Sequence, residues 1–245
     1  MNDQTQVIAD NCIMRLNDLR CCVIIPTYNN AGTLSAVIDE TLEYCADVIV
    51  VNDGCTDGTA QIIGSFGERI RSLTQERNQG KGVALQCGMA YAQRLGFRYA
   101  ITMDSDGQHY PSDIPKFVDA IEQNPGTLLV GARNLNADGM PGKNTFANRF
   151  SNFWFRLETG VRLEDTQSGF RAYPLDKISL GSHLLTGGYE FELEMLVFTA
   201  WRGIPVKNIP VRVYYPPEGE RVSHFRPFRD FTKISILNTL LVLYC

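Results

Sequence analysis

Two aspartates stand where a short apolar run ends, in the stretch YAITMDSDGQHYP at residues 99–111. Residues 99–103 have the apolar, β-branched and aromatic composition of a buried strand, and Asp104, Ser105 and Asp106 follow at once. Two carboxylates this close repel each other, and they lose hydration if they only pack. The pattern therefore indicates either a turn that caps the next element or a site that binds a ligand.

Three kinds of ligand chemistry fit two acids at this spacing. A calcium loop would need a glycine at its sixth position, where this chain has His109. A phosphatase that forms an aspartyl phosphate ends its motif with a hydroxyl residue on the first strand of its domain. Here Gln108 takes that place and earlier strands precede it. The third kind is a divalent metal, Mg²⁺ or Mn²⁺, that bridges the carboxylates and a diphosphate. It would offset the charge on a departing nucleoside diphosphate.

The first half of the chain alternates apolar runs with helical stretches, and these elements must position the acids. We expect strands at 21–26, 47–53, 69–75, 99–103 and 127–133, with helices over 31–45, near 57–66, after NQGKG and after the acid pair. This alternation predicts an α/β fold with a mainly parallel, doubly wound sheet in a single domain. The clusters NDGCTDGT and DSDGQ directly follow strands, where open parallel sheets bind ligands.

The second half is less regular. We expect an amphipathic helix in FANRFSNFWFRLETG, a loop and short strand in DTQSGFRAYP, a long helix in YEFELEMLVFTAWRG and a strand pair in IPVKNIPVRVYYPP. The C-terminal segment ISILNTLLVLYC is too short to span a bilayer. It is either a helix packed on the core or an interfacial helix whose basic start meets anionic lipid headgroups.

Composition narrows the class of protein. A net charge of −4 argues against general nucleic-acid binding, which leaves a basic footprint. The 7 cysteines are odd in number and contain no CxxC pair, which favours a reduced chain over a zinc cluster. The N-terminus lacks the pattern of a signal peptide. We therefore expect a cytoplasmic protein that could lie peripherally on the cytoplasmic face of a membrane. Nothing in the sequence indicates an oligomeric state.

Five motifs occur in order along the chain: VIIPTYNNAGTL, VIVVNDGCTDGT, NQGKGVAL, MDSDGQHYPSDI and DTQSGFRAYP. Together they resemble the inverting family 2 glycosyltransferases of GT-A fold. SGFRAYP and GERVSHFRP are most similar to the dolichol-phosphate mannosyltransferase branch, whose acceptor is a polyprenyl phosphate. The resemblance implies an N-terminal extension at 1–20, a GT-A domain at 21–225 and a C-terminal helix at 226–245. It implies a UDP- or GDP-sugar donor and Mg²⁺ or Mn²⁺, without naming the sugar.

The resemblance also assigns residues to the donor. Pro26, Tyr28 and Asn30 would line the base, although relatives often carry Glu where Asn30 stands, and Asp53 would contact base or ribose. Lys81 would meet the nucleotide or be solvated. In the acid-pair segment, Ser105 would contact the nucleotide. The metal ligands would be Asp104, Asp106 and Gln108: Asp104 would face the ribose or an outer metal water, and Asp106 and Gln108 would bind the metal directly.

On the acceptor side, the resemblance assigns Arg133 and Arg171 to the acceptor phosphate or the diphosphate. Asp165 would orient these arginines or act as base, so the expected catalytic residues are Asp106, Asp165 and Arg171. A basic flap containing Ser223, His224 and Arg226 would close over the diphosphate.

A phosphate acceptor is already anionic and needs no base, whereas a hydroxyl acceptor does. Glu190 and Glu192 lie where the family often has its base, and we expect Glu194 to be solvated. A transferase to a sugar hydroxyl or lipid headgroup remains an alternative. So does an inactive module that binds sugar nucleotides, although the intact Asp104 and Asp106 argue against it.

Overall fold

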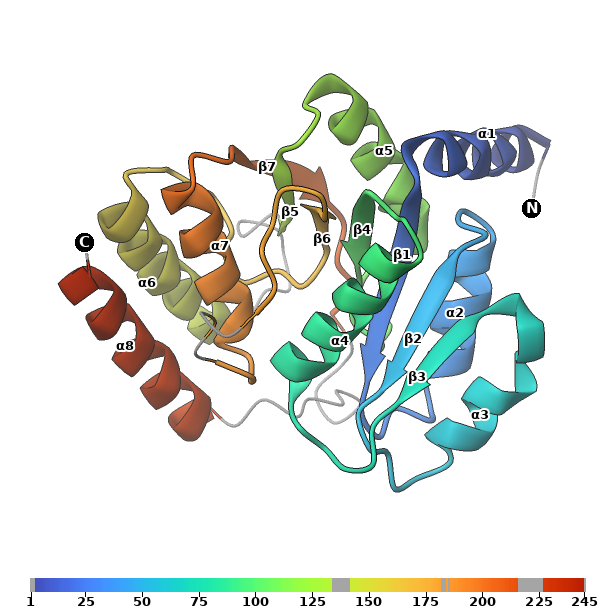
Figure 1. Cartoon of the computed structure of the whole chain (residues 1–245), viewed down its shortest axis with the longest axis horizontal. Helices are drawn as coiled ribbons and strands as arrows, with labels where there is room; N and C mark the ends of the chain where they lie inside the picture. The colour runs from blue at the N-terminus through green and yellow to red at the C-terminus, as the bar shows by residue number, and fades with distance from the viewer. Residues whose placement is uncertain (1–2, 134–141, 182–183, 185, 216–226, 245) are drawn as a thin grey trace.

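The computed structural model describes residues 3–133, 142–181, 184, 186–215 and 227–244, which form a sheet between two layers of helices (Figure 1). Its strands are β1 (Cys21–Thr27), β2 (Val48–Asn52), β3 (Arg71–Thr74), β4 (Tyr99–Thr102), β5 (Leu128–Arg133), β6 (Arg171–Pro174) and β7 (Val206–Val211). The strand order is β3-β2-β1-β4-β6-β5-β7. Only β6 runs antiparallel to its neighbours, β4 and β5. The predicted mainly parallel sheet is therefore confirmed.

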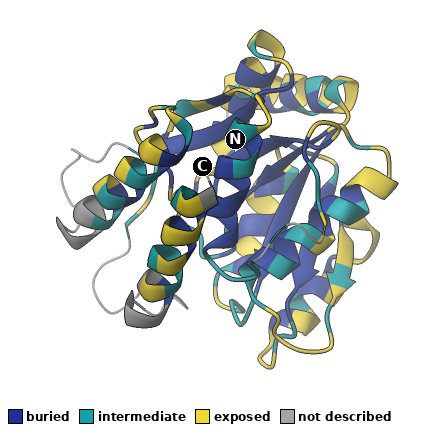
Figure 2. Ribbon diagram, turned by 60° about the vertical axis from the view of Figure 1, so that its left-hand side comes forward, coloured by how far each residue is buried: buried dark blue, intermediate teal, exposed yellow. Residues whose placement is uncertain are grey.

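The helices cover both faces of the sheet. They are α1 (Asp3–Leu19), α2 (Leu34–Leu42), α3 (Thr59–Ser65), α4 (Lys81–Arg94), α5 (Ile114–Gln123), α6 (Gly142–Thr159), α7 (Phe191–Trp201) and α8 (Pro227–Tyr244). Helices α1, α2, α3 and α5 share one core with the sheet, and α4, α6, α7 and α8 share the other. Figure 2 shows the buried strands between helices whose outer sides are exposed.

The central strands β1, β2 and β4 are apolar up to their last residue because both of their faces are buried. In β1, Val23 and Ile25 point to the core under α2, whereas Cys22 and Ile24 point to the core under α4. This two-sided burial explains why the strands read as unbroken apolar runs and not as alternating patterns.

The strand order predicts where a ligand would bind, at the carboxyl ends of β1 and β4, and we refer to this place as the crevice. From β1 the chain moves outward through β2 and β3 and then returns to β4, which lies on the other side of β1. Ligands of open α/β sheets bind at the carboxyl ends of strands where the order reverses in this way. Tyr28 follows β1 at that point, and Asp104 follows β4.

Two features of the second half differ from expectation. In place of the strand pair predicted from IPVKNIPVRVYYPP, the described residues form β7 alone, followed by an isolated bridge between Val213 and His109. Pro210 lacks the N–H that an inner strand would need, so β7 occupies the edge of the sheet. Within the described ranges, no helix has the length and apolar character to cross a membrane.

Candidate active site

The loops after β1 and β4 are joined at the crevice by Ser105. Its hydroxyl accepts a hydrogen bond from Asn30 Nδ2 at 2.7 Å, and its backbone carbonyl accepts one from Thr33 Oγ1 at 2.6 Å. Pro26 lies buried in β1, and Tyr28 is half-buried just beyond it. The structure thus brings the residues predicted for the base next to the acid pair.

The two acids sit in different electrostatic environments. Burial and the charge of Asp104 raise the pKa of Asp106 to about 6, although the Gln108 backbone N–H donates to its Oδ1 at 3.0 Å. Burial opposes ionisation of Asp104 as well, but the Lys81 ammonium outweighs it and holds the pKa of Asp104 below its ordinary value. Burial lowers the pKa of His109 to about 4, so this ring is neutral and packs against Phe170.

The donor set at the end of β4 fits a hard divalent cation. Asp104 and Asp106 carry carboxylate oxygens, and Gln108 in the same loop carries an amide oxygen, which are the atom types that such a cation binds. In the described parts of the chain, no group of three or more His, Cys, Asp and Glu side chains converges to hold a metal. Two carboxylates with an amide suit Mg²⁺ or Mn²⁺, which complete their coordination with phosphate oxygens and water.

Asp53 fixes the loop that carries the NQGKG motif. It lies directly after β2, is buried, and its two carboxylate oxygens accept hydrogen bonds from the backbone N–H groups of Gln79 and Gly80 at 2.7 and 2.9 Å. Gly54 follows with φ +66°, and a Cβ there would lie 2.3 Å from the backbone of Arg77. The turn therefore requires glycine, and Asp53 places the start of α4 at the crevice.

Lys81, the first residue of α4, projects into a cluster of charges beside the acid pair. Its Nζ lies 2.6 Å from Asp104 Oδ1 and 2.8 Å from Glu192 Oε2, and its side chain is mostly buried. It is therefore not the solvated lysine that was one of the two expectations. Glu192 comes from α7, so this cluster joins elements that are far apart in sequence.

Arg133 and Asp165 form a two-pronged ion pair at the end of β5. Arg133 Nε and Nη2 donate to the two carboxylate oxygens at 2.6 and 3.0 Å. Asn148 Nδ2 and the Gln167 backbone N–H also donate to Asp165, at 2.6 and 2.9 Å. Burial opposes ionisation of Asp165, but Arg133 outweighs it and lowers the pKa of this acid. The geometry suits a carboxylate that orients an arginine.

The side chain of Arg171, which was expected to bind a phosphate, is enclosed in the fold. The residue is 1% exposed, and its guanidinium donates to the backbone carbonyls of Ser168 at 2.7 Å and Thr166 at 2.9 Å. A third N–H donates to the carbonyl of Glu192. The SGFR motif predicts an arginine that contacts phosphate. In this structure the guanidinium of Arg171 links the loop before β6 to α7 through hydrogen bonds to backbone carbonyls.

The structure adds polar residues that the sequence did not single out. Asn208 in β7 accepts from the Glu164 N–H at 2.6 Å and donates to the Asp165 carbonyl at 3.0 Å, so it holds the loop that presents Asp165. Asn148 is fully buried in α6. Its neighbours on the same side of α6 include Ser151 and Asn152, so a polar helix face is the sequence signal that could have indicated it.

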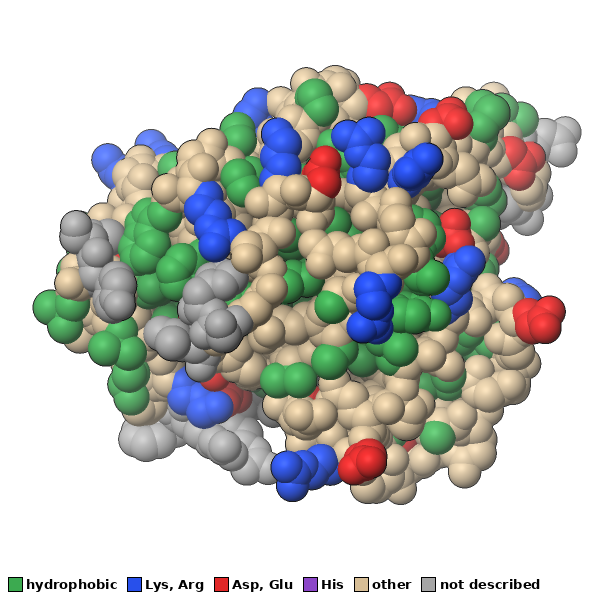
Figure 3. Space-filling view, viewed as in Figure 1, with side chains coloured by type: hydrophobic (Ala, Val, Ile, Leu, Met, Phe, Trp, Pro, Cys, Tyr) green, Lys and Arg blue, Asp and Glu red, His purple; other side chains and the backbone are tan. Residues whose placement is uncertain are grey.

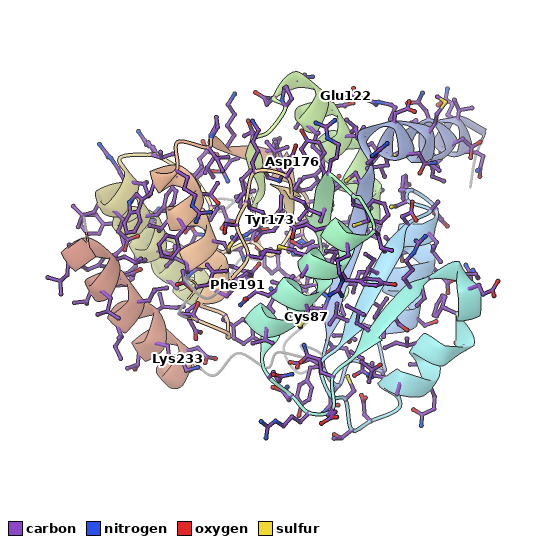
Figure 4. All side chains as sticks on the ribbon, in the orientation of Figure 1. Cys87, Glu122, Tyr173, Asp176, Phe191 and Lys233 are labelled. Carbon is purple, nitrogen blue, oxygen red and sulfur yellow. The ribbon has the colours of Figure 1, made fainter. Side chains whose placement is uncertain are left out.

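The acids of α7 differ in their surroundings. Glu194, which we expected to be solvated, is fully buried and accepts a hydrogen bond from the Thr186 N–H at 3.0 Å. The expectation failed because α7 is enclosed between α4 and α6. Glu190 lies 3.5 Å from Lys233 of α8, and Figure 4 labels this lysine. The predicted flap residues Ser223, His224 and Arg226 lie outside the described residues.

Comparison with known proteins identifies a family and several relatives by sequence. A model described as Glycosyl transferase family 2 matches residues 22–173. The chain is 28% identical over 204 residues to the polyprenol monophosphomannose synthase of Mycolicibacterium smegmatis. The alignment covers 78% of this chain and 76% of that protein. It is also 28% identical over 213 residues to a UDP-N-acetylglucosamine–dolichyl-phosphate N-acetylglucosaminyltransferase of Methanococcus voltae, covering 79% of this chain and 85% of that one.

A solved structure shares the arrangement of strands and helices. The glucosyl-3-phosphoglycerate synthase of Mycobacterium tuberculosis, solved with Mn²⁺, UDP and glucosyl-3-phosphoglycerate, superposes with a TM-score of 0.68 at 21% identity. The match covers 96% of this chain and 83% of that chain. The predicted fold class is confirmed by this likeness.

Proposed function

Because the chain belongs to glycosyl transferase family 2, we propose that it transfers a sugar from a nucleoside diphosphate sugar to the phosphate of a polyprenyl phosphate. The observation that carries this proposal is the acid pair at the end of β4, with Lys81 2.6 Å from Asp104. Relatives whose names specify polyprenol or dolichyl phosphate acceptors support the acceptor class.

The donor would lie across the carboxyl ends of β1, β2 and β4. Tyr28 and Asn30 would meet the base, and Asp53 would set the α4 N-terminus near the diphosphate. Asp104, Asp106 and Gln108 would hold Mg²⁺ or Mn²⁺. When bound there, the cation supplies positive charge against the leaving diphosphate.

The reaction would be an inverting displacement at the anomeric carbon of the sugar. An acceptor phosphate oxygen forms the new bond to that carbon as the bond to the donor's diphosphate oxygen breaks, and the nucleoside diphosphate leaves. The attacking oxygen is already anionic, so positioning and charge balance suffice and no base is required. This agrees with Asp165, whose carboxylate is engaged by Arg133, Asn148 and Gln167. Arg133, held in this way, would orient the acceptor phosphate.

A lipid acceptor also requires contact with a membrane surface, and two helices offer a suitable face. On α8, Ile236, Leu240 and Leu243 are 56%, 46% and 78% exposed, whereas Leu237 and Leu241 pack in the core. The tail is therefore both core-packing and partly exposed. Residues 236, 240 and 243 follow helical spacing from Lys233, so a basic group begins an apolar stripe.

Helix α6 repeats this arrangement beside α8. Phe153 and Leu157 are 60% and 56% exposed, and the exposed Arg149 and Arg156 lie on the same side of the helix. Figure 3 shows hydrophobic side chains gathered on the left of the molecule, where α6 and α8 lie. Basic groups next to exposed apolar side chains suit the anionic headgroups and acyl boundary of a bilayer.

The donor and acceptor are tested by incubating the purified chain with Mn²⁺ and a panel of UDP- and GDP-sugars, with and without polyprenyl phosphate. We expect release of one nucleoside diphosphate that is stimulated by polyprenyl phosphate and not by the corresponding polyprenol. Stimulation by polyprenol or by a free sugar would favour a hydroxyl acceptor instead. Binding without turnover under every condition would indicate an inactive module.

Membrane contact is tested by sedimentation with vesicles that contain anionic lipid. We expect Leu240→Glu and Phe153→Glu to reduce the bound fraction, whereas Leu95→Glu, a control on the exposed end of α4, should leave it unchanged. Equal sedimentation of all three variants and the wild type would contradict the assignment of this face.

A further inference from the structure

We propose that Glu192 is a positioning residue for the donor: it keeps the Lys81 ammonium at the crevice when Asp104 turns to the metal, so that Lys81 meets the diphosphate. The inference rests on the proposed function, because it presumes a diphosphate donor and a cation at the acid pair.

The cluster contains one ammonium and two carboxylates in a largely dry setting. Lys81 Nζ lies 2.6 Å from Asp104 Oδ1 and 2.8 Å from Glu192 Oε2, and the Glu192 side chain is 7% exposed. The Lys81 ammonium is thus flanked by two carboxylates that balance its charge, and an ammonium is the form in which lysine binds a phosphate.

The two carboxylates are not equivalent. Asp104 belongs to the acid pair, and a divalent cation there would compete with Lys81 for its oxygens. Glu192 lies in the first turn of α7 and is part of no such pair. With a cation on Asp104, Glu192 would remain the partner that neutralises the buried ammonium, and the ammonium would turn its remaining N–H groups toward the added phosphates.

The surroundings of Glu192 fix it in this role. Its Oε1 lies 3.7 Å from Arg171 Nε, and Arg171 also donates to the Glu192 carbonyl. The buried Arg171 therefore hydrogen-bonds the backbone of Glu192 and lies within ion-pair distance of its carboxylate. On another side, a Cβ at Gly169 would lie 2.5 Å from Asp104 Oδ2 and 2.8 Å from Lys81 Nζ, so the SGFR loop closes over the cluster.

This arrangement gives Glu192 a different task from that of a base. A carboxylate that shares a buried ammonium would have to release it in order to accept a proton. An acid is also repelled by phosphate, so Glu192 acts on the donor only through Lys81. The role of the SGFR motif then becomes indirect: Arg171 holds Glu192, Glu192 holds Lys81, and Lys81 meets the diphosphate.

The test measures calorimetric binding of a nucleoside diphosphate and of the matching monophosphate, with Mn²⁺ present, using whichever of UDP or GDP the wild type binds. Glu192→Gln and Lys81→Met should each weaken diphosphate binding by about tenfold, the loss expected for one charge-assisted hydrogen bond. Monophosphate binding should stay close to wild type. The double variant should bind no more weakly than Lys81→Met alone. Glu122→Gln, an acid paired with Arg15 far from the crevice (Figure 4), is the control.

Several outcomes would overturn the inference. The inference is wrong if Glu192→Gln weakens diphosphate and monophosphate binding to the same degree, or if its loss multiplies with that of Lys81→Met in the double variant. If Glu192→Gln unfolds, Lys81→Met tests the same link without touching α7, and wild-type diphosphate affinity in that variant refutes the role. A wild-type chain that binds neither UDP nor GDP refutes the proposed function itself, and that result is distinct from the others.

Discussion

Asp165 and Arg133 face each other with both carboxylate oxygens matched to the guanidinium fork, at 2.6 and 3.0 Å. The pair stands at the end of β5, where the crevice opens. Because Asn148 and Gln167 also donate to Asp165, this acid has little capacity left to accept a proton from a substrate. The geometry of Asp165 therefore suits a residue that orients Arg133 and not one that acts as a base.

We therefore expect Asp165→Asn to lower the free energy of unfolding by about 2 kcal/mol, through loss of a buried charge-assisted pair. The KM for the acceptor should rise while the pH profile of kcat keeps its shape. Denaturant unfolding and steady-state kinetics measure both. Asp176→Asn, which removes an exposed acid 3.6 Å from Arg98, should change neither. Loss of the rising limb of the pH profile with unchanged stability would instead identify Asp165 as a base.

A second prediction concerns acid stability and Asp113. This acid is fully buried and accepts hydrogen bonds from the Arg212 backbone N–H at 2.7 Å and from its Nε at 3.0 Å. Burial alone would raise the pKa of Asp113, but the Arg212 hydrogen bonds outweigh it and lower the pKa below 3.8. The folded state thus binds the proton more weakly than the unfolded chain does.

The contribution of Asp113 is therefore present above pH 3.8 and is lost as the pH falls below that value. Asp113→Asn should be less stable than the wild type at pH 7, and the difference in the free energy of unfolding should shrink as the pH falls below 3.8. Urea unfolding at each pH measures this. A difference that stays constant with pH would show that the charge of Asp113 is not what stabilises the fold.

A pair of helical glycines tests how tightly α4 and α7 pack. Replacing glycine by alanine in a helix normally stabilises it by up to about 1 kcal/mol. At Gly82, however, a Cβ would lie 2.5 Å from the Phe191 Cβ and 2.7 Å from the backbone of Gly187 (Figure 4 labels Phe191). Gly64 in α3 has open space around it. Gly82→Ala should lower the thermal midpoint, whereas Gly64→Ala should raise it slightly; the same sign for both would refute the close packing.

Arg171 provides a prediction that separates a structural role from substrate binding. Lysine keeps the charge but loses the fork that reaches the carbonyls of Ser168 and Thr166, so buried acceptors would be left unpaired. Arg171→Lys should lower the free energy of unfolding by about 2 kcal/mol or more. The exposed Arg98→Lys is the matched control and should have little effect. A fully stable Arg171→Lys that loses only acceptor affinity would place this arginine on the substrate after all.

The sequence predicts the sheet well because its central strands are buried on both faces. The apolar runs around Ile24 and Val50 can be buried on both sides only in a sheet that helices cover on both faces. The position of the acid pair follows from the same logic, since Asp104 comes directly after such a strand. The antiparallel direction of β6 could not be predicted, because the composition of a strand of four residues does not indicate which way it runs in the sheet.

The side-chain contacts in the site are harder to predict from the sequence than the sheet is. Lys81 and Glu192 are separated by more than half of the domain, and only the packing of α4 against α7 brings them within 2.8 Å. Arg171 is a second example. Its motif predicts contact with a phosphate, but the sequence does not show that the side chain is buried and that its guanidinium donates to three backbone carbonyls.

The most direct measurement uses the donor found in the nucleotide-sugar panel and follows transfer of its labelled sugar into the lipid phase with polyprenyl phosphate as acceptor. The wild type should form a lipid-linked sugar with Mn²⁺ and lose that activity on chelation. Asp106→Asn should remain folded and lose most turnover, because removing a charged metal ligand costs several kcal/mol of transition-state stabilisation. Undiminished transfer by Asp106→Asn in the presence of a chelator, or no labelled lipid from the wild type with any donor, would contradict the proposed function.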